Sequence, residues 1–190
     1  MIIGVDLDNT MYKDDAIEIA SRELGYLYDS NYNTSWGLIF FSAELQNRIR
    51  ELWSDPEHMG NLTPLEGVKE TLKAMRDAGN QIVVVTARIP ELDECSRAML
   101  RRDFEGLIDE VFVVGLDQNK TPLLKDIGVG LWIDDAPHQV LSTQKAGIKT
   151  VMISNNSTKY NWHVRMERGI IFRESIRDIE KEIWDTPLNP

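Results

Sequence analysis

Two pairs of aspartates stand directly after apolar runs of the chain. Asp6 and Asp8 follow Met1–Val5, and Asp134 and Asp135 follow a second run of the same kind. A carboxylate removed from water is costly unless it is paired or bound to a cation. If the two runs are neighbouring strands, four acids meet at one sheet edge, where they repel one another unless a hard cation lies between them. Mg²⁺ is the common ion bound by a few carboxylates together with water and a substrate phosphate, so the spacing predicts a Mg²⁺ site.

The same residues predict phosphoryl transfer through a covalent intermediate. An aspartate is a weak nucleophile, but phosphorus held by Mg²⁺ and by hydroxyl and ammonium donors is a good electrophile for it. We expect Asp6 to attack phosphorus. We expect Asp8, two residues further along an extended backbone, to protonate the leaving oxygen and later to deprotonate the attacking water. Thr86 and Lys120 would neutralise charge on the transferring group.

Each of these residues has an ordinary structural interpretation when it is taken alone. An Asp-x-Asp at a strand end often caps the next helix, threonine favours strands, and lysines are mostly exposed. Their order favours the joint interpretation, because the acids and Thr86 follow strands and Lys120 precedes the helix that leads into the fourth strand. Thr10, Ala87 and Arg88 lie at the same predicted edge and complete the candidate phosphate-binding set.

Five short apolar runs predict the strands that position these side chains. They are nearly continuous in Val, Ile and Leu, as strands buried on both faces of a parallel sheet are. The runs are Met1–Val5, Gln81–Val85, Glu110–Val114, Val129–Ile133 and Ile148–Ile153. Helical patterns separate most of them, so we expect an α/β fold with a doubly wound, Rossmann-like parallel sheet.

Start and stop signals give the expected helices. Thr63-Pro64-Leu65-Glu66 has the pattern of a capping box, which predicts a helix that begins there and ends at Gly79. Further helices are expected over 90–104, from Thr121, over 136–147 and, after a polar loop, over 174–184.

Residues 11–62 interrupt this alternation. The segment is rich in aromatic residues and too long for a loop between a strand and a helix. We expect two helices, over 14–28 and 42–53, that form a small cap inserted over the carboxyl edge of the sheet. Residues 1–10 and 63–190 would then form the core domain and 11–62 the cap, with Trp36 and Phe40 as its candidate substrate contacts.

The composition narrows the classes of partner. A net charge of −10 argues against the phosphate-backbone footprint of a duplex nucleic-acid binder. No apolar stretch approaches the ~18 residues needed to cross a bilayer, and the first apolar run has no basic residues before it, as a signal peptide would. We therefore expect a cytoplasmic protein without membrane association. The sequence leaves the oligomeric state open, a homodimer included.

The motifs as a set resemble those of the haloacid dehalogenase-like phosphatase superfamily. The match is carried by Asp6-Leu7-Asp8-Asn9-Thr10, Thr86, Lys120 and Asp134-Asp135, with a cap inserted after the first motif, and spans residues 1 to about 153. Within the superfamily, Ile133-Asp134-Asp135, the stretch Leu62–Val68 and the short helical cap are similar to the 5′(3′)-deoxyribonucleotidases. This resemblance implies that Asp6, the main-chain carbonyl of Asp8 and Asp134 hold Mg²⁺, with Asp135 supporting them. It also implies that aromatic residues of the cap stack on a base.

The sequence departs from that family at two points. Ala87 stands where the family usually has a serine, and Lys120 lies further from the aspartate pair than the family's lysine does. Lys125 is therefore the alternative to Lys120. Lys120 precedes a Thr-Pro helix start and can point at the site, whereas Lys125 would lie within the helix.

Three functions remain open from the sequence. The leading expectation is a Mg²⁺-dependent phosphomonoesterase that acts on (deoxy)nucleoside monophosphates through an aspartyl-phosphate. A phosphatase for another small phosphorylated metabolite is the alternative in the same class. A non-enzymatic phospho-acceptor module also combines acids, a threonine and a lysine around Mg²⁺. Asp8 and the inserted segment argue against that module, because an acid/base group would hydrolyse its phospho-signal.

Overall fold

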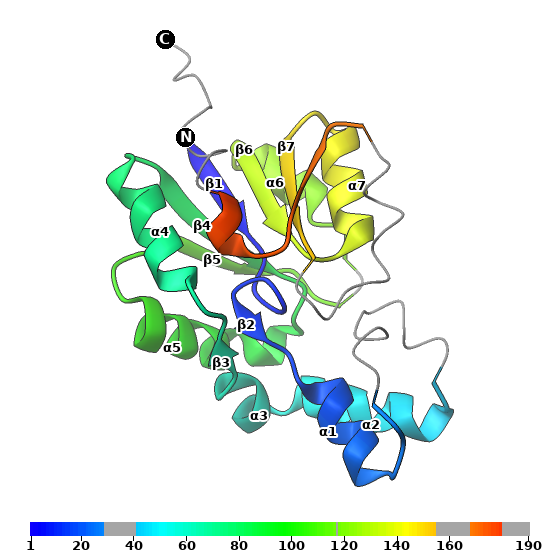
Figure 1. Cartoon of the computed structure of the whole chain (residues 1–190). Helices are drawn as coiled ribbons and strands as arrows, with labels where there is room; N and C mark the ends of the chain where they lie inside the picture. Colours follow the sequence, from blue (N-terminus) through cyan, green and yellow to red (C-terminus); the bar gives the residue numbers. More distant parts are fainter. Residues whose placement is uncertain (29–40, 117, 155–167, 180–190) are drawn as a thin grey trace.

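The chain folds around a parallel sheet with helices on both faces (Figure 1). The computed structural model describes residues 1–28, 41–116, 118–154 and 168–179. Within these, the main sheet has six strands in the order β5-β4-β1-β6-β7-β8. The strands are β1 (Ile2–Val5), β4 (Gln81–Thr86), β5 (Glu110–Val113), β6 (Val129–Asp134), β7 (Lys149–Ile153) and β8 (Ile170–Arg173).

The helices between the strands cover the two faces of the sheet. Helices α4 (Val68–Asp77) and α5 (Asp93–Phe104) cover one face, and α6 (Thr121–Asp126) and α7 (Pro137–Lys145) cover the other (Figure 1). A short 3-10 turn, η3 (Pro90–Leu92), precedes α5. The direction of the crossovers reverses after β5, so the expected doubly wound, Rossmann-like architecture is confirmed.

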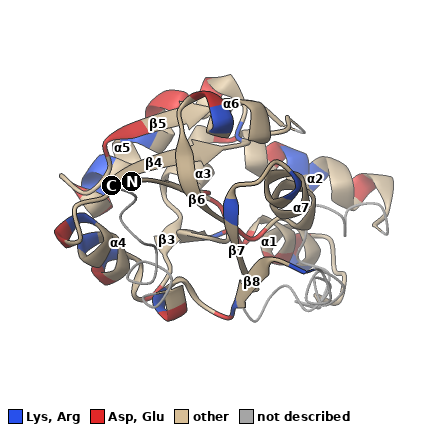
Figure 2. Cartoon of the chain, turned by 90° about the horizontal axis from the view of Figure 1, so that it is seen from above, with Lys and Arg blue, Asp and Glu red and all other residues tan. Residues whose placement is uncertain are grey.

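Both faces of the sheet are buried, as the near-continuous apolar runs of its strands predict. Ile3 and Val5 of β1 pack with Leu72 and Met75 of α4 in one core cluster. On the opposite face, a second cluster gathers Val83, Val85, Leu124, Val129 and Trp132. The charged residues lie on the surrounding helices, while the central strands carry almost none (Figure 2).

The start of α4 differs from the predicted capping box. Thr63–Pro64 form β3, which pairs antiparallel with β2 (Tyr12–Lys13), and α4 begins only at Val68. The residue before it, Gly67, has φ +81°, a left-handed conformation that suits glycine. The tertiary pairing of Thr63–Pro64 with Tyr12–Lys13 thus outweighs the local helix signal.

The end of the described chain also differs from prediction. Strand β8, a half-buried edge strand that pairs parallel with β7, was not predicted. The predicted helix over 174–184 is represented by one short 3-10 turn, η5 (Ile176–Ile179), and residues 180–184 lie outside the described residues. Ile176 and Ile179 are buried against the α4 face of the sheet, as their spacing indicates.

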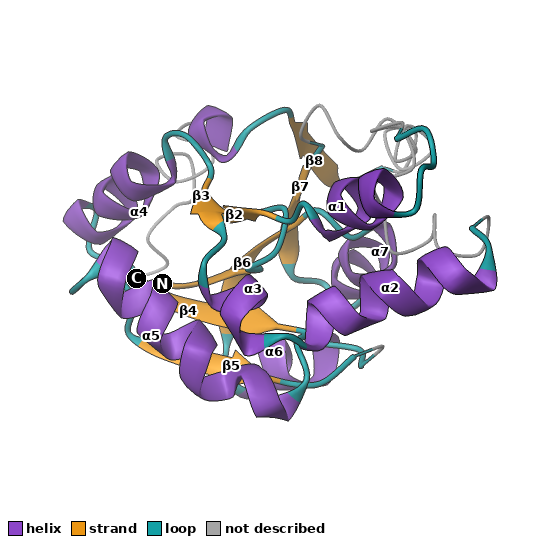
Figure 3. Cartoon of the chain, turned by 90° about the horizontal axis from the view of Figure 1, so that it is seen from below, coloured by secondary structure: helices purple, strands orange, loops and turns teal. Residues whose placement is uncertain are grey.

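The described residues of the segment 11–62, which are 11–28 and 41–62, lie across the carboxyl end of the sheet (Figure 3). It contains α1 (Ala16–Glu23), α2 (Ala43–Ser54, capped by Ser42) and a short helix that was not predicted, α3 (Pro56–Gly60). Helices α1 and α2 pack through their own small apolar cluster. The β2–β3 pair joins the start of the segment to the two residues that directly follow it. The division of the chain into cap and core stays a prediction. No described helix is both long and apolar enough to span a bilayer.

Candidate active site

Backbone pairing brings the acidic residues of two strands together. Asp6 follows β1 and Asp134 ends β6, and Asp6 N donates to Ile133 O at 2.9 Å, so that the two strands stay in register up to the acids. The carboxylates of Asp6, Asp134 and Asp135 each place an oxygen within 4.8 Å of the others. Three carboxylates without nitrogen or sulfur donors form a set that suits Mg²⁺.

Lys120 is the cation of this cluster. Its Nζ donates to Asp6 Oδ1 and, at 3.0 Å, to Asp134 Oδ2, and it lies 5.0 Å from the centre of the Trp132 ring. Gln139 Oε1 accepts from Lys120 N at 3.0 Å and fixes the backbone there. Lys125, the alternative lysine, is exposed on α6. The structure therefore brings Lys120, and not Lys125, to the acids.

Crowding perturbs the protonation of the cluster. Burial raises the pKa of Asp6 to about 7, with Lys120 acting in the opposite direction and Asp134 and Asp8 raising it further. Burial, then Asp6 and Asp134, hold the pKa of Asp135 well above its ordinary value. Burial alone would lower the pKa of Lys120, but Asp134 and Asp6 outweigh it, so that this pKa is raised. The raised pKa values of Asp6 and Asp135 reflect the cost of ionising three buried carboxylates beside one ammonium, a cost that a divalent cation would offset.

A tight turn carries Asp8 from β1 to the mouth of the site. Met11 N and Tyr12 N both donate to Leu7 O, and Asn9 N donates to Tyr12 O at 2.7 Å. Asn9 has φ +59°, the left-handed region that asparagine tolerates better than most side chains. The turn reverses the chain within a few residues and leaves the Asp8 side chain 23% exposed.

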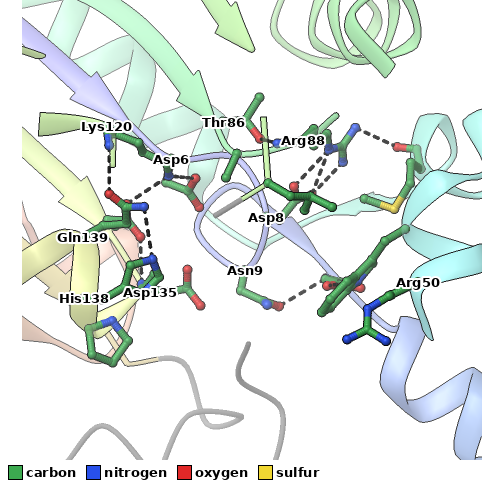
Figure 4. A pocket seen from close by; sticks show the side chains of 18 of the residues that line it. Asp6, Asp8, Asn9, Arg50, Thr86, Arg88, Lys120, Asp135, His138 and Gln139 are labelled. Carbon is green, nitrogen blue, oxygen red and sulfur yellow. Dashed lines mark hydrogen bonds and ion pairs between the residues drawn. The ribbon is translucent and has the colours of Figure 1, made fainter. Parts of the chain in front are cut away.

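The Asp8 carboxylate is held by Arg88. Arg88 Nε and Nη2 donate to both of its oxygens, with the shortest contact at 2.6 Å between Nη2 and Oδ1 (Figure 4). Arg88 is buried, and burial would lower its pKa, but the charge of Asp8 and the hydrogen bonds to it raise it. Arg88 was predicted as a phosphate ligand, and in the structure its guanidinium contacts protein acceptors.

Two threonines of the predicted set differ in their surroundings. Thr86 ends β4 and lines the site beside Ala87. Thr86 Oγ1 accepts from Arg88 N at 3.2 Å, which leaves the hydroxyl proton available for a bound phosphate. Thr10 is buried and is not among the residues that line the pocket, and its hydroxyl has no hydrogen-bond partner within the described part of the chain.

The acids open into a pocket of about 350 Å³ between the sheet edge and α2. Most of the predicted residues line it: Asp6, Asp8, Thr86, Ala87, Arg88, Lys120, Asp134 and Asp135. Helix α2 forms the opposite wall with Gln46, Arg50 and Trp53, and His138 lies beside Gln139 on the core side (Figure 4). Trp36 and Phe40, the predicted substrate contacts, lie outside the described residues.

Asp14 is a pocket residue that the sequence did not reveal. It is buried, its Oδ2 accepts from Trp53 Nε1 at 2.8 Å, and its Oδ1 accepts from Ala16 N at 3.0 Å. Burial, followed by the charge of Asp8, raises its pKa to about 6. In the sequence, Asp14 marks only the start of a helix. Its place in the pocket depends on the turn at Asn9, whose Oδ1 accepts from Asp14 N.

Comparisons with known proteins identify the family and the fold of the chain. The family model described as "5' nucleotidase, deoxy (Pyrimidine), cytosolic type C protein" matches residues 1–179. None of the curated proteins matched the chain.

Several solved structures have the same fold at low sequence identity. A haloacid dehalogenase-like hydrolase from Streptococcus pneumoniae is similar with a TM-score of 0.66 and 12% identity, over 95% of this chain and 97% of that one. A protein from Lactobacillus delbrueckii described as a phosphoglycolate phosphatase has a TM-score of 0.65 and 14% identity, over 96% and 97%. A phosphatase predicted in Clostridium acetobutylicum has a TM-score of 0.65 and 13% identity, again over 96% and 97%.

Proposed function

Because the chain belongs to the family of cytosolic type C 5′ nucleotidases, deoxy (pyrimidine), among the haloacid dehalogenase-like phosphatases, we propose that it is a Mg²⁺-dependent phosphomonoesterase acting on (deoxy)nucleoside monophosphates. The observation that carries the proposal is the contact of Lys120 Nζ with both Asp6 and Asp134 at the floor of the pocket. A cytoplasmic location is proposed with it, in keeping with the description of the family.

The first half of the reaction uses Asp6 and Asp8. A carboxylate oxygen of Asp6 attacks phosphorus, the bond from phosphorus to the ester oxygen breaks, and Asp8 gives its proton to that oxygen. In the second half Asp8 takes a proton from water, whose oxygen attacks phosphorus and releases Asp6. The partial exposure of Asp8 supports this assignment, because an acid/base group has to reach both the leaving oxygen and the water.

Positive charge and hydroxyl donors stabilise the transferring phosphoryl group. Lys120 Nζ and Thr86 Oγ1 both line the pocket from the core side, where they can donate to phosphate oxygens. Asp6, Asp134 and the main-chain carbonyl of Asp8 would hold Mg²⁺, with Asp135 beside them. When bound, the ion would supply the positive charge that reduces repulsion between carboxylates and phosphate.

The wall formed by α2 supports a nucleotide as the substrate. Trp53 offers an aromatic surface, and the side chains of Gln46 and Arg50 offer hydrogen-bond donors to the carbonyl groups of a base. Trp36 and Phe40 remain proposed contacts of the same segment. Arg50 also suits a carboxylate, so a small phosphorylated acid, such as the phosphoglycolate named for some of the similar structures, is the second candidate.

Phosphate release from a panel of substrates tests the proposal. The panel contains purine and pyrimidine nucleoside 5′- and 3′-monophosphates, ribose 5-phosphate, phosphoglycolate and p-nitrophenyl phosphate, each assayed with Mg²⁺ and with EDTA. We expect the highest kcat/KM for a nucleoside monophosphate, loss of turnover in EDTA and recovery with Mg²⁺. A higher kcat/KM for phosphoglycolate would move the assignment to the second candidate. Full turnover in EDTA would contradict the metal requirement.

A further inference from the structure

The guanidinium of Arg88 joins three separate segments of the chain. Nε and Nη2 hold the Asp8 carboxylate at distances of 2.6 to 3.2 Å. Nη1 donates to Met59 O at 3.1 Å and to Ser96 Oγ at 3.0 Å. Asp8 belongs to the turn after β1, Met59 to α3, and Ser96 to α5. All three nitrogens of the group thus have protein acceptors.

This arrangement differs from that of a phosphate ligand. Arg88 is 4% exposed, and a guanidinium that turned towards a phosphate would leave the carboxylate of Asp8 and a buried main-chain carbonyl without their donor. Breaking a largely buried charged pair in this way is unfavourable. Lys120 and Thr86, in contrast, line the pocket with a donor directed at the acids or available to phosphate.

We infer that Arg88 is a positioning residue: it fixes the orientation of the Asp8 carboxylate towards the leaving group and ties that orientation to α3 and α5. Two parallel N–H donors on one carboxylate define its plane, which a single contact cannot do. The contacts of Nη1 with Met59 O and Ser96 Oγ in turn hold the guanidinium. Asp8 lies within a turn, directly before the left-handed Asn9, and its side chain is partly exposed, so Arg88 is what restrains it. The inference rests on the proposed function, because it requires Asp8 to be the acid/base group.

Dependence on the leaving group separates this role from phosphate binding. A nucleoside is a poor leaving group that needs a proton as the ester bond breaks, whereas p-nitrophenolate leaves readily without one. The ratio of kcat/KM for a nucleoside monophosphate to kcat/KM for p-nitrophenyl phosphate therefore reports on Asp8. We expect Arg88→Met to lower this ratio by about tenfold or more, within the ~10²–10⁴-fold worth of a general acid. A phosphate ligand would affect both substrates alike.

A double-mutant cycle tests whether Arg88 acts through Asp8. In an Asp8→Asn background, Arg88→Met should cost little further activity towards the nucleotide, since the group that it orients is already disabled. Three results together would overturn the inference in favour of a phosphate ligand. They are losses that multiply in the double mutant, an equal loss for both substrates, and weaker inhibition by inorganic phosphate. If Asp8→Asn alone leaves nucleotide turnover unchanged, the proposed function of Asp8 fails, and the inference fails with it.

Control variants distinguish a loss of activity caused by a misplaced Asp8 from one caused by a general structural defect. Arg97→Met is the control, because Arg97 also joins a carboxylate, Asp93, to a main-chain carbonyl, Val111 O, outside the pocket. It should leave the ratio at the wild-type value. If circular dichroism shows that Arg88→Met is not folded, Arg88→Lys and Ser96→Ala are used to test the inference instead. Each removes part of the contacts, and each should lower the ratio by a smaller factor in the same direction. An unchanged ratio in both would overturn the inference.

Discussion

Asp6 and Asp8 lie two residues apart but have different partners. Asp6 is buried against Lys120, and Asp8 is partly exposed against Arg88. A nucleophile benefits from a fixed position and from a cation that counteracts the effect of burial on its pKa, as Lys120 does for Asp6. An acid/base group benefits from access to the leaving group and to water. The surroundings therefore favour the assignment of roles that the spacing alone predicts.

The two aspartates should respond differently to replacement by asparagine. Asp6→Asn should abolish turnover, because an amide does not attack phosphorus. Asp8→Asn should lower kcat by ~10²–10⁴-fold and still allow the phosphoenzyme to form with a good leaving group. Phosphate release and mass spectrometry of rapidly quenched enzyme measure both effects. Residual turnover in Asp6→Asn, or phosphate found on another residue, would contradict the assignment of the nucleophile.

Asp14 makes a testable contribution to the pH dependence of folding. Its pKa is about 6 in the folded protein, above the ordinary 3.8, so folding disfavours its ionised form. Below pH 4 the carboxyl is protonated in both states and has no effect. Between pH 4 and pH 6 the carboxyl is ionised in the unfolded chain but still protonated in the folded protein, so stability falls as the pH rises, by about 3 kcal/mol at most, and levels off above pH 6.

Asp14→Asn should remove this part of the pH dependence. The free energy of unfolding, measured with urea at pH 4 and pH 7, should fall less between the two values in the variant than in the wild type. The comparison cancels the contributions of Asp6 and Asp135, which titrate in both proteins. The same pH dependence in both would show that Asp14 does not titrate in this range.

Strand β1 depends on a glycine for its contact with β6. A Cβ on Gly4 would lie 2.7 Å from Trp132 Cε3, closer than atoms in contact can lie. Trp132 is fully buried, and its ring lies beneath the ammonium of Lys120. The absence of a side chain at Gly4 thus allows the ring to pack where it supports the site.

Gly4→Ala should therefore destabilise the protein. Overpacking at such a contact costs ~1–3 kcal/mol, to be measured as the free energy of unfolding in urea. Gly130→Ala is the control, since Gly130 lies in β6 and an added Cβ would meet nothing closer than Met1 Sδ at 3.4 Å. We expect the control to stay within about 0.5 kcal/mol of the wild type. Equal effects of the two substitutions would show that the Trp132 contact is not limiting.

The elements that were predictable from the sequence are those whose signals are local. Apolar runs end sharply at Asp6, Thr86 and Asp134, so the strand ends, and with them most of the candidate site, follow from the pattern. The predicted helix start at Thr63–Pro64 was wrong because pairing with Tyr12–Lys13, which is distant in sequence, decides the conformation of these two residues. Strand β8 was not predicted although Ile170, Ile171 and Phe172 are apolar, because so short a run does not distinguish a strand from a loop, and only its pairing with β7 decides its conformation.

The α2 side of the pocket could not be derived from local patterns. Gln46, Arg50 and Trp53 lie on one helix, but nothing in their spacing shows which face meets the sheet edge. That depends on the packing of α1 against α2 and on the hydrogen bond from Trp53 to Asp14. Tertiary contacts, and not local patterns, place the side chains of this segment at the pocket. The α2 wall was therefore the part of the site that could not be predicted.

At the scale of the whole molecule, a metal ion bound at Asp6, Asp134 and Asp135 would couple β1 to β6. The protein carries a net charge of −10, and these three carboxylates concentrate part of it in a buried place. A ligand that binds only the folded state stabilises it in proportion to the logarithm of its concentration over Kd. Stability in the absence of any substrate therefore reports on this site independently of activity.

Mg²⁺ should raise the melting temperature. At a concentration about a hundred times Kd the expected gain is ~2.7 kcal/mol, or roughly 5–10 °C for a chain of this size. Thermal melts in Mg²⁺ are compared with melts in EDTA and in NaCl of equal ionic strength, because general screening of the negative charge would appear in both salts. Asp134→Asn should remove most of the shift specific to Mg²⁺. Asp77→Asn, which deletes an exposed carboxylate on α4 outside the cluster, should retain it. A shift that NaCl reproduces, or one that survives in Asp134→Asn, would contradict a metal site at the ends of β1 and β6.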